Sequence, residues 1–209
     1  MTTTGLQALA TDRSRAALLL VDYQVGLCTP GPDCLAPPLA AEVARRGTLA
    51  TSAKVLAAAR EAGLLTVFVR LAFDEGYVLR TNRTARFDRY PNDQLLKVTD
   101  PGAQIVPELA PEGELVMTKS CVDPFVGTTL LAALHASHID TVVVGGVATT
   151  LAVESTIRHA ADSGLQPVVV EDMCASFSPE LHDFAFGNVL SLFAEITTSH
   201  EVIGALAAG

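Results

Sequence analysis

Two ionisable residues each end an apolar run that has the character of a buried strand. Asp22 closes the run LLLVD, and Lys119 closes LVMTK. Burial disfavours the charged form of a carboxylate unless a cation or a hydrogen-bond donor lies nearby. An aspartate and a lysine at one edge of a sheet could therefore form a pair that transfers a proton. The alternative is that Asp22 caps a helix and that Lys119 is a solvated surface charge.

A turn of small residues is the third feature that could take part in chemistry. The segment TVVVGG is followed by VATT and then by a helix-like stretch that contains Ala152. A strand that turns directly into a helix presents backbone N–H groups where negative charge is stabilised, so an oxyanion could be held there. Ala152 stands in the first helical turn, where a nucleophile would be well placed. Alanine, however, has no nucleophilic group. An ordinary crossover helix packed closely on a sheet would also have small residues here.

The remaining apolar segments predict the elements that must position these residues. Continuous apolar runs, rather than alternating ones, indicate parallel strands covered on both faces. The pattern predicts one domain over 1–209, a three-layer α-β-α fold with a doubly wound, six-stranded, mostly parallel sheet of the Rossmann-like class. Ligands in such folds bind at the carboxyl ends of the strands. Strands are expected at 16–22, 64–71, 114–119, 140–146, 167–172 and 196–199, and helices at 40–62, 128–137, 149–163, 179–193 and 201–208.

Two segments fall outside this alternation. Residues 1–14 are expected to be an N-terminal tail. Residues 72–111 form a long connection, and connections of this length are often lids. The connection contains Arg80, Arg83, Arg86 and Arg89, in a chain with only 14 lysines and arginines. Because arginine binds carboxylates in a bidentate manner, we expect Arg80 and Arg83 to contact a carboxylated substrate. A solvated or subunit-bridging helix with i,i+3 spacing is the equal alternative.

Three segments, in order from about residue 16 to residue 206, resemble the isochorismatase-like (cysteine hydrolase) superfamily. The first is LLLVDYQ, which ends the first strand, and the second is LVMTKSCVDPFVGTTL. The third, GVATTLAVESTIR, is similar to the signature G-[IV]-x-T-x-x-C-V-x-x-T-x-R. It matches at six positions, while Ala152 replaces the cysteine. These matches are Gly146, Val147, Thr149, Val153, Thr156 and Arg158.

The resemblance implies a site and a mechanism. In members with the cysteine, the aspartate takes the thiol proton, the lysine favours the charged forms, and the thiolate attacks an amide carbonyl. This assigns catalytic positions to Asp22, Lys119 and Ala152. It also implies a cis peptide bond before the turn, between Val147 and Ala148. The expected substrate contacts are Gln24, Arg80, Arg83, Phe125, Val147 and Ala148.

Ala152 leaves three functional hypotheses open. A natural alanine suits a hydrolase that protonates a vinyl ether and adds water, because this reaction needs the aspartate but no thiol. An amidohydrolase whose cysteine was replaced by engineering would carry the same residue. A catalytically silent protein that still binds a small molecule is the third possibility. Cys121 or Cys28 could substitute for the missing thiol, but packed bystander thiols are the simpler interpretation.

Composition and sequence pattern limit the partners, the compartment and the cofactors that we expect for this protein. A net charge of −9 argues against nucleic acid, whose binding depends on cationic contacts to phosphates. No apolar run approaches the ~20 residues that span a bilayer, and the N-terminus lacks the apolar core of a secretory signal, so we expect a cytoplasmic protein. The five histidines are dispersed and show no HxH or HExxH spacing, so we expect no metal and no cofactor.

A positive mean hydropathy of +0.36 at this modest size, together with the resemblance, predicts a homo-oligomer. Light scattering at micromolar concentration should give a mass above that of one chain. A monomer in that measurement would contradict the prediction.

Overall fold

The computed structural model describes residues 4–208, and its centre is a six-stranded sheet in the order β3-β2-β1-β4-β5-β6. Every pair of neighbouring strands is parallel. This confirms the predicted α/β class, with a sheet that is parallel throughout. The strands are β1 (Ala16–Val21), β2 (Leu65–Leu71), β3 (Leu115–Lys119), β4 (Thr141–Val147), β5 (Gln166–Ala175) and β6 (Glu195–Thr197).

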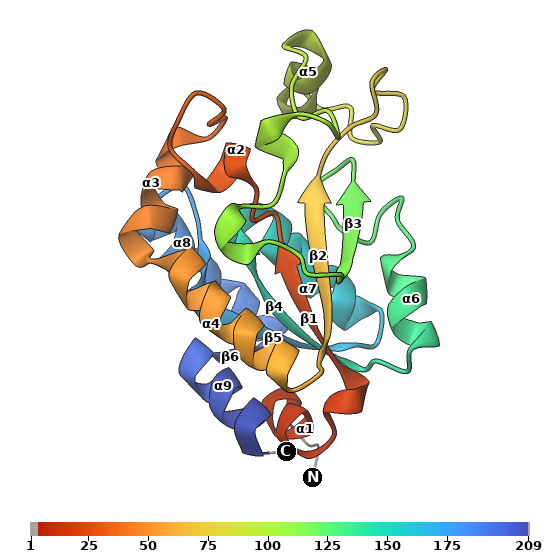
Figure 1. Ribbon diagram of the computed structural model, residues 1–209, viewed down its shortest axis with the longest axis vertical. Helices are drawn as coiled ribbons and strands as arrows, with labels where there is room; N and C mark the ends of the chain where they lie inside the picture. The colour runs from red at the N-terminus through yellow and green to blue at the C-terminus, as the bar shows by residue number, and fades with distance from the viewer. Residues whose placement is uncertain (1–3, 209) are drawn as a thin grey trace.

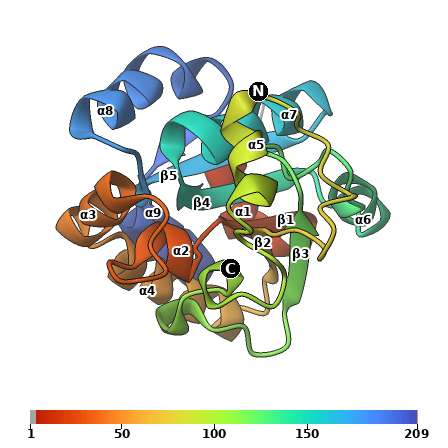
Figure 2. The ribbon, with the colours of Figure 1, turned by 90° about the horizontal axis from the view of Figure 1, so that it is seen from above.

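Helices cover both faces of this sheet, as the ribbon shows from the side and from above (Figures 1 and 2). On one face lie α1 (Gly5–Thr11), α3 (Pro37–Arg46), α4 (Thr48–Glu61) and α9 (Ser199–Ala208). On the other lie α6 (Leu130–Ala136), α7 (Glu154–Asp162) and α8 (Pro179–Asn188). Two further helices stand beyond the carboxyl ends of the strands, α2 (Val25–Cys28) and α5 (Ala85–Asn92). Within residues 4–208 no helix is long and apolar enough to cross a membrane.

The central strands are apolar on both sides because each side packs into a different core. In β1, Leu18 and Leu20 belong to the cluster under α3, α4 and α9, whereas Leu19 and Val21 belong to the cluster under α6 to α8. All six residues of β1 and all seven of β4 are buried. The continuous apolar runs in the sequence are thus explained by helices on both faces.

The expected helix over 40–62 is wrong, because the structure divides it into α3 and α4. Gly47 separates them with a left-handed backbone, φ 66°, which glycine adopts without a side-chain clash. The expected tail over 1–14 is also corrected. Residues 1–3 lie outside the described residues, but α1 follows at once and Leu9 is 1% exposed, so this segment is part of the core.

Smaller differences lie near the carboxyl edge of the sheet. The predicted helix over 149–163 begins as a π-helical turn, Thr149–Val153, before α7. The predicted helix over 179–193 ends at Asn188 with α8 and is followed by a short 3-10 turn. Strand β5 runs on to Ala175, with a shift of register against β4 between Val144 and Gly146.

The long connection over 72–111 is a folded cover over the carboxyl ends of the strands. In Figure 1 the arrowheads of β2 and β3 point toward α5, and the two chain termini lie at the opposite end. The connection has its own small core, in which Phe73 packs against the rings of Tyr77, Phe87 and Tyr90. It therefore lies where a lid would lie, and its opening stays a prediction.

Strands β1 and β4 are in unusually close contact at the end that carries the predicted site. A Cβ added to Gly146 would stand 2.4 Å from the carbonyl oxygen of Val21, one residue before Asp22. The contact is with backbone, which cannot rotate away. A glycine is therefore required here if the two strands are to keep their register.

Gly146→Ala is expected to lower the free energy of unfolding by about 1–3 kcal/mol, because the added methyl group overpacks the strand pair. Gly187→Ala is the matched control, since nothing lies within 4 Å of its added Cβ in α8. The control should be neutral or stabilising by up to about 1 kcal/mol. Urea unfolding measures both, and equal stabilities would contradict the assignment.

Candidate active site

An ion pair between Asp22 and Lys119 occupies the carboxyl end of the sheet. The lysine Nζ lies 2.8 Å from the Oδ2 of Asp22 and also donates to the carbonyl of Val122 at 2.6 Å. Their strands are not neighbours, because β2 lies between β1 and β3. The lysine therefore reaches across the end of β2. This confirms the expectation that the two side chains meet at one edge of the sheet.

Both partners of this pair are almost completely removed from water. Asp22 is 5% exposed and Lys119 is 1% exposed. The second carboxylate oxygen, Oδ1 of Asp22, is buried and has no hydrogen-bond partner among residues 4–208. An unpartnered buried oxygen is costly, so it marks the point where a proton or a bound molecule would be stabilised. Asp22 itself adopts a left-handed backbone, φ 59°, as the chain leaves β1.

The proton affinity of Asp22 follows from two opposed effects. Burial raises the pKa of this carboxyl, and the attraction and hydrogen bond of Lys119 lower it by less, so that the pKa lies above its ordinary value. Asp22 therefore holds a proton at a pH where an ordinary aspartate would have lost it. Such a group can act as a general acid at a higher pH than an ordinary aspartate.

The turn after β4 brings Ala152 to the same place. The peptide bond between Val147 and Ala148 is cis, as the resemblance implies, and the carbonyl of Ala148 accepts hydrogen bonds from the N–H groups of Leu151 and Val153. Ala152 is 3% exposed and lines one pocket with Asp22. The surface that it offers to a ligand is a methyl group.

A buried chain of hydrogen bonds holds this turn from behind. The hydroxyl of Thr149 lies 2.9 Å from Nδ1 of His182, whose Nε2 lies 2.7 Å from the Glu171 carboxylate. Glu171 also pairs with Arg46 of α3, and these contacts, the His182 hydrogen bond first, hold the pKa of Glu171 below its ordinary value. The first residue of the turn is thereby tied to α8, β5 and α3.

The pocket has a volume of about 450 Å³, open space at its mouth included. Its lining is mostly apolar with a few polar groups, as is usual for small-molecule sites. Its floor holds Asp22, Val147, Ala148 and Ala152. Its outer wall comes from Leu151, from Phe177 after β5, and from Arg86, Phe87 and Tyr90 of α5.

Gln24 does not take the substrate-binding position expected of it. Its side-chain Nε2 donates to the carbonyls of Leu71 and Ala103, and its Oε1 accepts from the N–H of Leu71 at 2.8 Å. The residue is fully buried and lies outside the pocket lining. The amide is therefore occupied in fastening the long connection to β2, and the expected substrate contact is corrected.

Arg80, Arg83 and Phe125 also lie outside the pocket lining. Arg80 is 7% exposed and pairs with Asp88 at 2.7 Å, while Arg83 faces solvent. Phe125 is buried in the core under α6 to α8 and stacks on the ring of His159. Arg80 and Phe125 are thus engaged elsewhere and Arg83 is turned to solvent, and a substrate contact of these three residues stays a prediction.

A different arginine of the arginine-rich segment lines the pocket. Arg86 lines the pocket, and its guanidinium lies 5.7 Å from the ring centre of Phe177. Arg86 and Arg89 lie on α5, whereas Arg80 and Arg83 precede it. The i,i+3 spacing alone does not show which arginine reaches the pocket. Nothing in the sequence around Phe177 and Leu151 indicated that these residues would line the pocket.

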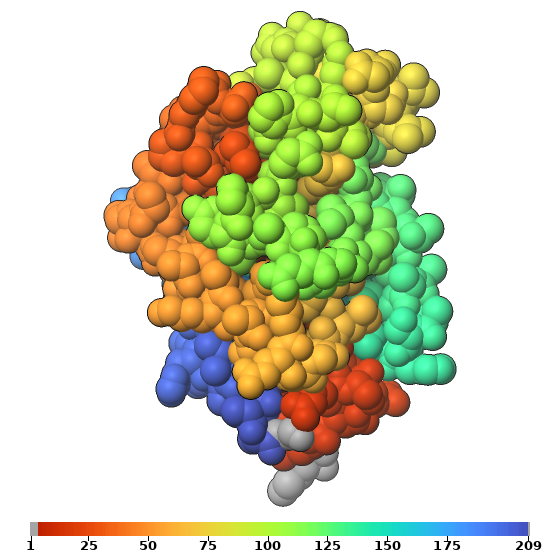
Figure 3. All heavy atoms as spheres, viewed as in Figure 1, coloured from red at the N-terminus to blue at the C-terminus, as the bar shows by residue number. Residues whose placement is uncertain are grey.

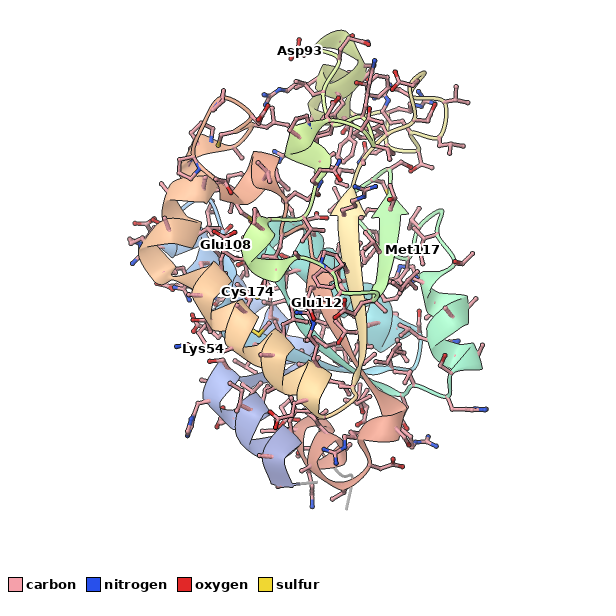
Figure 4. The ribbon with its side chains drawn as sticks, viewed as in Figure 1. Lys54, Asp93, Glu108, Glu112, Met117 and Cys174 are labelled. Atoms are coloured by element: carbon pink, nitrogen blue, oxygen red, sulfur yellow. The ribbon has the colours of Figure 1, made fainter. Side chains whose placement is uncertain are left out.

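None of the neighbouring thiols is arranged as a replacement nucleophile. Cys121 lines the pocket, but its Sγ faces the carbonyl of Asp123 at 3.3 Å. Burial raises the pKa of Cys28 far above its usual range and that of Cys174 to about 12, so both remain thiols. Cys174 lies on β5 in the interior (Figure 4). Residues 4–208 contain no group of three or more His, Cys, Asp or Glu residues placed to hold a metal ion.

Comparisons with known proteins identify the family of this chain. Residues 16–201 match the family model described as the isochorismatase domain. The chain belongs to the isochorismatase family. As a member of this family it is a hydrolase. Its described fold is shared with a cysteine hydrolase from Pseudomonas syringae pv. phaseolicola, at a TM-score of 0.82, 26% identity and 95% coverage of both chains.

Curated relatives of this isochorismatase-family protein include two amidohydrolases. The maleamate amidohydrolase of Pseudomonas putida is 26% identical, covering 90% of this chain and 85% of the relative. The ureidoacrylate amidohydrolase RutB of Variovorax paradoxus is 30% identical, covering 79% of this chain and 71% of the relative. Both names describe cleavage of a C–N bond in those proteins.

The raised pKa of Asp22 predicts how stability responds to pH. A group whose pKa is raised by folding contributes stability that is lost as pH rises through the folded pKa. Asp22→Asn resembles the protonated form at every pH. As pH rises above the ordinary aspartate pKa, the parent should therefore lose stability relative to the variant, as measured by urea unfolding. Asp162→Asn, at an exposed position, should show no such trend. A relative loss for Asp22→Asn would mean that the Lys119 attraction dominates.

Proposed function

We propose that this isochorismatase-family hydrolase cleaves a vinyl ether by general acid catalysis, with water as the nucleophile and no covalent enzyme intermediate. The observation that supports this proposal most is the buried, unpartnered Oδ1 of Asp22, in a pocket where Ala152 presents a methyl group. Burial raises the pKa of Asp22, which supports the role of acid. No thiol is needed for this reaction.

The proposed reaction balances with water alone. The carboxylic acid of Asp22 gives its proton to the terminal methylene carbon of the vinyl ether, and the ether carbon becomes an oxocarbenium ion. Water adds to that carbon and loses a proton, which restores Asp22. The hemiketal then collapses, so that the C–O bond breaks to an alcohol and a ketone. Lys119 is held by Asp22 and by the Val122 carbonyl, and it stabilises the carboxylate that forms after proton transfer.

Arg86 is the proposed partner of a substrate carboxylate. It lines the pocket, and no ion pair engages it among residues 4–208. A carboxylate next to the ether carbon would make the ketone product a 2-oxo acid. The apolar side chains of Leu39, Leu71 and Phe87 would surround the rest of the molecule and keep water away from Asp22.

Hydrolysis of a C–N bond is the second candidate, and the two amidohydrolase relatives favour it. Water would then attack the amide carbonyl carbon, ionised Asp22 would take the water proton, and that proton would pass to the leaving nitrogen. The two candidates place opposite demands on Asp22. The ether reaction needs the protonated acid, whereas the amide reaction needs the carboxylate.

The test is turnover of isochorismate and 2-phenoxyacrylate beside maleamate and ureidoacrylate, followed across pH. The first proposal expects ether cleavage whose rate falls as pH rises through the Asp22 pKa. In D₂O the methyl group of the 2-oxo acid should gain one deuterium. Asp22→Asn should lower the rate by at least about 10²-fold, and Asp162→Asn should leave it unchanged. Amide turnover that rises with pH would favour the second candidate. Binding without turnover would favour a silent binding protein.

Ala152→Cys separates a water-shaped pocket from an interrupted thiol site. If water is the nucleophile, the variant should gain little on amides, and intact-protein mass spectrometry should find no adduct on residue 152. A trapped acyl adduct that disappears with Asp22→Asn would instead show that the site was built for a thiolate. That result would replace the proposal with amidohydrolysis through a covalent intermediate.

A further inference from the structure

A second hollow lies beside the pocket, and we call it the outer groove. It has a volume of about 810 Å³, open space included, and it shares five lining residues with the pocket. The shared residues are Leu27, Ala36, Arg86, Tyr90 and Phe177. The two hollows therefore adjoin along these five side chains. Its walls are the orange-red segment with α2 and the yellow-green segment with α5, which stand together at the top of Figure 3.

The charge of the outer groove is positive on an acidic protein. Arg86 lines both hollows, and Arg89 lines the outer groove alone. Residues three apart on a helix share a face, with about 5–6 Å between their Cβ atoms. No acidic side chain belongs to the lining of the groove. The chain as a whole has a net charge of −9, so this pair is a local exception.

Neither arginine is held firmly by an acid. Arg89 lies 3.6 Å from Asp93, and both side chains are more than half exposed, so this contact contributes little. Asp93 stands at the outer tip of the α5 region, as Figure 4 shows. Arg86 rests on the ring of Phe177. Both guanidinium groups are therefore available to a ligand.

The rest of the groove is suited to a flat apolar body. Pro37 and Pro38 begin α3 on one side, and Tyr90 and Phe177 stand on the other. Prolines and aromatic rings offer large contact areas that lose little conformational freedom on binding. A ligand that filled both hollows would thus have its reacting end at Asp22 and an apolar segment between these walls.

We propose that the outer groove is a subsite for a second negative charge, so that the substrate is a dianion recognised jointly by Arg86 and Arg89. This deepens the proposed function and rests on it for the identity of the reacting end. One charge would be the carboxylate at Arg86, and the other would lie at Arg89. The same two guanidinium groups would also hold the two charges of a single phosphate group. A monoanion would satisfy only one of them.

Isothermal calorimetry with rigid, non-reacting probes tests the subsite without turnover. Benzoate carries one charge, isophthalate carries two carboxylates on one ring, and phenyl phosphate carries a single dianionic group. Isophthalate or phenyl phosphate should bind at least tenfold more tightly than benzoate, and the stronger of the two identifies the source of the second charge. Equal affinities for all three, or no binding of any, would overturn the proposal.

Variants assign the extra affinity to its residues. Arg89→Gln should reduce the affinity for the dianions to that for benzoate and leave benzoate binding unchanged. Arg86→Gln should weaken all probes about tenfold. Arg45→Gln is the matched control, because Arg45 is also exposed and paired with an acid on its own helix, but it lines neither hollow. An Arg89→Gln variant that behaves like the control would overturn the subsite. Calorimetry is independent of hydrolysis, so a failure of the proposed reaction would leave this result intact.

Discussion

The buried pair of Asp22 and Lys119 is the constraint on which the site depends. Removing two charges from water is costly, and the cost is acceptable only where geometry brings the charges together. Here Asp22 follows β1 and Lys119 ends β3, so that their side chains meet across the end of β2. The Nζ of Lys119 lies 2.8 Å from the Oδ2 of Asp22. Because the lysine shields only Oδ2, the other oxygen remains unpartnered beside the pocket floor. Burial raises the pKa of Asp22 by more than the attraction of Lys119 lowers it, so the pKa lies above its ordinary value.

Two sets of hydrogen bonds keep the surroundings of this pair in place. On one side the side-chain amide of Gln24 fastens the long connection to the end of β2 through Leu71 and Ala103. On the other side His182 joins Thr149 at the turn to Glu171 on β5. Each of these polar groups is satisfied inside the protein, which gives a rigid wall rather than a ligand contact. The pocket is therefore framed by polar residues that lie outside its lining.

Ala152 changes the chemistry of this site without changing its frame. The cis peptide bond, the π-helical turn and the ion pair are all present around a methyl group. The overall fold is shared with a cysteine hydrolase at 26% identity and a TM-score of 0.82. A scaffold that already carries a buried acid at this point can direct water instead of a thiolate. The apolar methyl also favours the protonated acid, because it adds no group that would stabilise the carboxylate.

The sequence by itself determined the fold class, the parallel strands and the meeting of Asp22 with Lys119. Continuous apolar runs and strand-end polar residues are local signals, and the parallel sheet converts them directly into position. Only the tertiary structure decided which side chains reach the pocket. Gln24 turned inward to bond main chain, Phe125 joined a core, and Arg86 rather than Arg80 faced the cavity. These outcomes depend on the rotation of a helix and on partners distant in sequence, neither of which a local pattern of residue types encodes.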